Sequence, residues 1–144
     1  MTDNIHKAVW EWLLTCPYIR DLYFNYARAG TGDTVLVPMT ACKHAVVQTF
    51  ASGATEERYD FSLTHYAMIF DDPNSVANME TLLDIEMLGA WISEQDRAGN
   101  FPELGEGFTV TAVGAHESGA GYFTPQGNDT GKYTFQFYVD YLKG

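Results

Sequence analysis

Two long runs of alternating side chains place the strongest constraint on how this chain folds. In residues 58–70 and again in residues 132–142, apolar or aromatic side chains recur at every second position, with mostly polar ones between them. A period of two puts successive side chains on opposite faces of a β-strand. Each run therefore predicts a long strand with one face on a core. The predicted inward-facing sets are Tyr59, Phe61, Leu63, His65, Ala67 and Ile69, and Tyr133, Phe135, Phe137, Val139 and Tyr141.

Helical spacing marks two other segments. Residues 2–16 carry apolar side chains along one side of a helix, with Thr2 or Asp3 as the N-cap and Pro17 as the stop. Residues 73–98 predict a longer helix that ends at Gly99, because glycine enters the left-handed cap conformation at little cost. The predicted buried stripe of this longer helix comprises Met79, Leu83, Met87, Ala90 and Trp91, widened by Leu82 and Ile85.

Shorter strands are expected at 22–27, 35–39, 44–50 and 107–113, with the third of these forming a hairpin with the run at 58–70. Pro38 has no N–H to donate to a ladder, so 35–39 is expected at a sheet edge. Together these segments predict an α+β fold, with two helices packed on one face of a mostly antiparallel, twisted sheet of about five strands. We expect a single domain over residues 1–144.

The charge balance excludes several classes of partner. The chain has 19 acidic and 8 basic residues, a formal net charge of -11. Gripping DNA or an anionic membrane needs a basic face, so specific nucleic-acid binding and membrane binding are not expected. Two cysteines, Cys16 and Cys42, are too few for a disulfide framework, and we expect thiols and synthesis in a reducing cytoplasm.

Recognisable chemistry is sparse, and we expect no catalytic, cofactor-binding or metal-binding residues. The four histidines have no ligand-like spacing to one another, and His65 is expected to be a hydrogen-bonded core residue. His116 with Asp129 would suit a cation, but we favour a solvated loop for these residues. Lys43 and His44 beside Cys42 are weak support for a nucleophile. No two carboxylates stand out as an acid and base pair.

Two long connections, 29–43 and 114–131, are the remaining functional signal, because long loops on a compact scaffold often carry binding. With its elements in this order, the chain resembles small minor capsid or tail-completion proteins of tailed bacteriophages and prophages, the tail terminator group. The resemblance spans most of the chain, apart from those two connections. It rests on the segments WLLTCP (12–17), ERYDFSL (57–63), NSVANMETL (74–82), AWISEQDRAGNFPEL (90–104) and YTFQFY (133–138).

The resemblance implies a non-enzymatic virion protein, made in the bacterial host cytoplasm. It would form a homo-oligomeric ring, hexameric in that group, that terminates the tail and joins it to the head. The implied partners are other copies of the chain, the tail tube and head-tail connector proteins. An acidic lumen would let DNA pass, since negative walls repel phosphate.

Two other functions stay open at the level of sequence. One is a small-molecule-binding or catalytic α+β domain with a pocket between sheet and helices, for which His65, Tyr66 and Tyr138 are candidate groups. The other is an adaptor that acts on a host protein without closing a ring.

Overall fold

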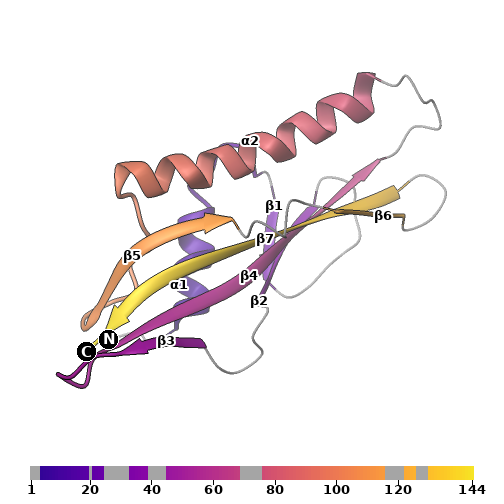
Figure 1. Cartoon of the computed structure of the whole chain (residues 1–144). Coiled ribbons are helices and arrows are strands. Elements are labelled where there is room, and N and C mark those ends of the chain that lie inside the picture. The colour runs from indigo at the N-terminus through magenta and orange to yellow at the C-terminus, as the bar shows by residue number, and fades with distance from the viewer. Residues whose placement is uncertain are drawn as a thin grey trace.

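The described part of the chain forms two helices and one sheet (Figure 1). The computed structural model describes residues 4–19, 21–24, 33–38, 45–68, 76–115, 122–125 and 130–144. The elements are α1 (Ile5–Leu13), β1 (Asp21–Phe24), β2 (Asp33–Pro38), β3 (Ala45–Thr49), β4 (Thr55–Met68), α2 (Val76–Ala98), β5 (Phe108–Ala115), β6 (Tyr122–Pro125) and β7 (Thr130–Lys143). The predicted α+β class is confirmed.

The sheet is built around β4 and β7, which run side by side through its middle (Figure 1). They pair antiparallel from Thr55 opposite Lys143 to Met68 opposite Thr130. β2 and β3 pair with the other side of β4, while β5 and β6 pair with the other side of β7. β1 adds to β2 as the single parallel pair among the described strands. The sheet has seven strands rather than about five.

The apolar face predicted from the alternation is confirmed for its described central residues, whereas the Ala67 side chain and Ile69 lie outside the described set. Tyr59, Phe61 and Leu63 of β4 are buried, as are Phe137 and Val139 of β7. Phe61 lies directly opposite Phe137, and their ring centroids are 5.8 Å apart. Both helices contribute to the same core cluster as these strand residues.

α1 begins at Ile5, one or two residues later than the predicted caps imply. Its N-cap is Asn4 rather than Thr2 or Asp3, and the Asn4 side chain accepts a hydrogen bond from the Lys7 backbone N–H at 3.0 Å. That bond satisfies one of the donors left free at a helix start. The buried side of α1 follows the expected helical period and comprises Ile5, Ala8, Val9, Trp12 and Leu13.

The predicted buried stripe of α2 is confirmed at Trp91 but wrong at Leu83, Met87 and Ala90, which are exposed. Leu83 and Met87 are 55% and 37% exposed, whereas Leu88, Trp91 and Ile92 are buried. The side chains of Met79, Leu82 and Ile85 lie outside the described set. Two overlapping apolar stripes run along this helix. The stripe that contains Leu88, Trp91 and Ile92 is buried, and the one that contains Leu83 and Met87 is exposed.

The orientation of α2 is set by contacts near its C-terminal end. The Trp91 ring lies 5.2 Å from the Trp12 ring of α1, measured between centroids. The Asp96 carboxylate accepts a hydrogen bond of 3.1 Å from the Val113 backbone N–H of β5. Gly99 ends the helix in the left-handed region, with φ of 74°, as predicted. Trp12 donates to the Asn100 carbonyl at 2.9 Å, which ties the helix end to α1.

β2 is not an edge strand, contrary to the prediction from Pro38. It lies between β1 and β4 in the sheet. The described pairing with β1 runs from Asp33 to Leu36, and Pro38 lies outside that described pairing.

The predicted loop 114–131 is shorter than expected. Gly114 and Ala115 belong to β5, residues 122–125 form β6, and Thr130 and Gly131 begin β7. Short pairing segments within a polar, glycine-rich run carry little sequence signal. Of the segment 29–43, residues 33–38 form β2 and the rest lie outside the described residues.

The orientation of α2 can be tested with a matched pair of substitutions. Ile92→Ala should lower the free energy of unfolding by about 2–5 kcal/mol, because it leaves a cavity in the core. Leu83→Ala should change it by less than about 0.5 kcal/mol, because the side chain is already in water. Urea unfolding followed by circular dichroism measures both, and a larger loss at Leu83 would contradict this orientation.

Candidate functional site

Two of the three residues proposed for a sheet–helix pocket, His65 and Tyr138, lie on opposite faces of the sheet. His65 lies on the helix-covered face of β4, half-buried, and its Nδ1 is 3.0 Å from the Thr34 hydroxyl. Tyr138 lies on the opposite face, since it alternates with the buried Phe137 and Val139. The Tyr66 side chain is outside the described set. His65 is therefore hydrogen-bonded as predicted, though only partly buried.

The other candidate groups give little support to catalysis. Cys42, His116 and Asp129 lie outside the described residues. Cys16 is buried, and that burial raises the pKa of its thiol, which disfavours the reactive thiolate. Within the described ranges, no group of three or more His, Cys, Asp or Glu side chains is placed to hold a metal ion.

An ion pair joins β4 and β7 on the face opposite the helices. The Arg58 guanidinium donates two hydrogen bonds to Asp140, at 2.6 and 2.9 Å, and lies 4.2 Å above the Tyr138 ring centroid. The hydrogen bond to Asp140 raises the pKa of Arg58, so the guanidinium stays charged. Gly114 leaves room for Tyr138, because a Cβ there would lie 2.7 Å from the phenol oxygen. Since both charges are matched, we assign this pair a structural role.

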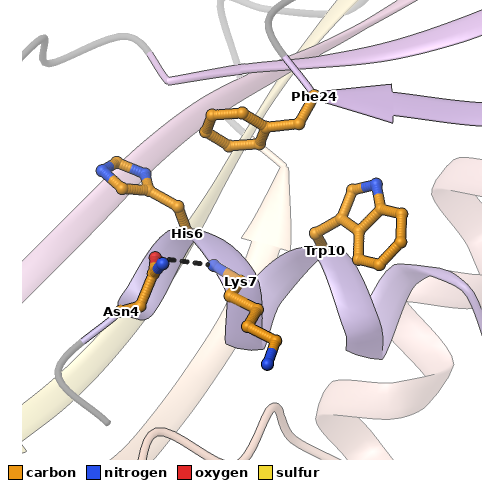
Figure 2. Close-up of a pocket in the computed structure, with 5 residues that line it drawn as sticks. All are labelled: Asn4, His6, Lys7, Trp10 and Phe24. Atoms are coloured by element: carbon orange, nitrogen blue, oxygen red, sulfur yellow. Dashed lines mark hydrogen bonds between the residues drawn. The ribbon is translucent and has the colours of Figure 1, made fainter.

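A hollow of about 280 Å³ lies between α1 and β1 (Figure 2). Four of its lining residues come from α1 or its cap, and Phe24 of β1 faces them across the gap (Figure 2). Figure 2 shows the Lys7 side chain directed away from Phe24, so the hollow is walled mainly by rings. The lining residues are Asn4, His6, Lys7, Trp10 and Phe24.

The walls of this hollow are held in place by the core. His6 Nδ1 and the Tyr59 hydroxyl share a hydrogen bond of 2.7 Å. The His6 ring also contacts Phe24 edge-on at 5.4 Å between centroids, and the Trp10 indole N–H donates to the Leu22 carbonyl at 3.3 Å. Sequence reasoning missed this site. The spacing of His6 and Trp10, four residues apart, was a signal that they share one side of α1.

The outer side of α2 forms an exposed apolar surface, which we call the α2 outer stripe. It consists of Leu83, Met87 and Ala90, all exposed and spaced four and three residues apart. Side chains at such spacing are neighbours on one side of a helix. Scattered apolar residues on a surface need no explanation, but neighbouring ones at an exposed helix side are typical of contact surfaces.

The chain matches no protein-family model and no curated protein. No described helix is both long enough and apolar enough to span a membrane.

Two buried tyrosines on the helix-covered face make the free energy of unfolding depend on pH in the alkaline range. Tyr59 bonds to His6, and the Tyr141 hydroxyl donates to Glu57 at 3.1 Å. Burial raises the pKa of both phenols above the ordinary value of 10, and the Glu57 charge and hydrogen bond raise that of Tyr141 further.

Their contribution to stability is complete below pH 10 and is lost as the pH rises, because unfolded tyrosine gives up its proton first. We expect each tyrosine to lower the free energy of unfolding by up to about 1.4 kcal/mol per pH unit above pH ~10. The double variant Tyr59→Phe/Tyr141→Phe should show a shallower loss in urea unfolding between pH 9 and 11. Identical pH slopes in the two proteins would refute the assignment.

Proposed function

We propose that the protein is a non-enzymatic structural subunit of a phage or prophage virion. It assembles into a ring, hexameric as in the tail terminator group that it resembles, at the tail end or the head-tail junction. There it terminates or completes the tail and contacts the tail tube and head-tail connector proteins. The subunit is made in the host cytoplasm and is then incorporated into the virion.

The observation that carries this proposal is the α2 outer stripe. Leu83 and Met87 are 55% and 37% exposed on a helix whose other side is anchored in the core. Burying a Leu or Met side chain contributes roughly 1.5–3 kcal/mol. In a ring, each subunit presents one surface to a different surface of the next, so one such stripe per subunit is buried all the way round.

Charge supports the same proposal. Subunits of net charge -11 repel one another, so ring closure needs apolar contact and screening by salt or divalent cations. Exposed carboxylates also lie on α2, at Glu86 and Glu94, beside the outer stripe. An acidic ring would let DNA pass without the counterion release that makes binding tight.

We expect a serine double variant, Leu83→Ser/Met87→Ser, to abolish assembly without unfolding the subunit. Light scattering and negative-stain imaging at high concentration, with and without magnesium, should find closed rings for the natural chain and monomers for the variant. Leu14→Ser is the matched control, because Leu14 is 48% exposed but is the C-cap residue of α1, away from the stripe. A natural chain that stays monomeric throughout, or a variant that assembles normally, would contradict the proposal.

A second candidate function, binding of a small apolar molecule, is favoured by the hollow between α1 and β1. Its aromatic walls are fixed by hydrogen bonds, as in preformed ligand sites. None of the described lining residues forms an acid and base pair, so this hypothesis is binding rather than catalysis.

Titration with indole tests this second function. Bound indole should shift the NMR signals of His6 and Trp10, and Phe24→Ala should weaken binding about fivefold, since an aromatic pair contributes ~0.5–1.5 kcal/mol. Phe50→Ala is the control, because Phe50 is equally exposed but lies in the turn between β3 and β4. Equal effects of the two substitutions would exclude the hollow as the binding site.

A further inference from the structure

A groove of about 680 Å³ lies beside the first residues of β5. It is separate from the α2 outer stripe and from the hollow at β1. Its floor and walls include Phe101 in the connection after α2, together with Phe108 and Val110 of β5, all half-buried. Two carboxylates, Glu11 of α1 and Glu103, also line it, and both residues are exposed. The groove is therefore lined by both apolar side chains and two exposed carboxylates.

The groove borders an edge of the sheet. β5 is the last strand in the order β1-β2-β4-β7-β5, and its described pairing is with β7 alone. Asp96 of α2 accepts the Val113 N–H, so the helix occupies the second half of this edge. No such contact to α2 is described at residues 108–110, which also form one wall of the groove. Within this stretch the Phe108 N–H donates to the Gly105 carbonyl at 3.3 Å, and the pairing with β7 shifts register between Val110 and Ala112. An edge beside a groove suits strand addition, in which backbone bonds give affinity and pockets select side chains.

The charge of the groove determines what kind of segment suits it. Its described lining holds two carboxylates and neither lysine nor arginine. Glu11 is 3.6 Å from Lys7, but both side chains are largely exposed, so this pair is weak and easily exchanged. The net charge of -11 further favours the approach of a cation.

We propose that this groove and the start of the β5 edge bind an extended, basic segment of a partner protein by strand addition. The segment pairs its backbone with the edge from the Phe108 carbonyl to Val110, since the Phe108 N–H is already bonded to Gly105. Its apolar side chains lie over Phe101, Phe108 and Val110, while alternating lysine or arginine side chains reach Glu11 and Glu103. This inference goes beyond ring formation and does not require it.

The test uses the full chain and three labelled peptides of equal length. The first alternates valine and lysine, the second has the same charge but a proline in place of a central valine, and the third has glutamate in place of lysine. Fluorescence anisotropy gives the affinities, and amide shifts in NMR spectra locate the site. Only the first peptide should bind well, with shifts at residues 99–105 and 108–111. The proline peptide should bind about tenfold more weakly, because it loses backbone hydrogen bonds.

A matched pair of charge reversals separates a local site from general attraction. Glu103→Lys should weaken the valine–lysine peptide about fivefold, because it places a like charge at the groove. Glu106→Lys should change the affinity for this peptide less than about twofold. This substitution changes the net charge by the same amount, but Glu106 lies outside the described lining of the groove. Circular dichroism should show both variants folded.

Equal binding of the proline peptide, or equal effects of the two reversals, would overturn the proposal in favour of unspecific attraction. Amide shifts confined to another surface, or no binding at millimolar peptide, would overturn it as well. If the variant Leu83→Ser/Met87→Ser loses ring formation but still binds the peptide, the lost function belongs to the α2 outer stripe and not to the groove.

Discussion

The antiparallel pairing of β4 with β7 is the interaction on which the rest of the structure depends. The two strands pair without a register shift from Thr55 to Met68, and every other strand attaches directly or indirectly to this pair. Their shared apolar face supplies the floor on which both helices pack. On their other face, the ion pair of Arg58 and Asp140 joins the same two strands by two hydrogen bonds. A change in register would displace both faces together.

The sequence predicts both of these long strands, but not their pairing with each other, because alternation over more than ten residues is hard to satisfy in any other conformation. It also predicts the end of α2, since Gly99 occupies the left-handed region there. It does not predict which side of α2 is buried. Trp91 belongs to both apolar stripes, and the choice is made by Trp12 and the Val113 N–H, which are distant in sequence.

The candidate sites were harder to predict, because each joins elements that are distant in the chain. The hollow needs Phe24 of β1 to face His6 of α1, and the groove needs the connection after α2 to lie beside β5 and Glu11. The β2 prediction failed for a related reason. Pro38 lacks a backbone donor at one position only, and β2 pairs with β1 through Asp33 to Leu36, which precede it.

The hydrogen bond from Val113 to Asp96 also bears on how copies of this chain avoid associating in the wrong way. A sheet edge that is open along its whole length can pair with the same edge of another molecule and grow into fibrils. Because the Val113 N–H of β5 donates to the Asp96 carboxylate of α2, the open edge is shorter and has a negative charge beside it. An approaching identical edge would then bring two carboxylates together. Unlimited edge-to-edge pairing between molecules is thereby disfavoured, while contacts through other surfaces stay available.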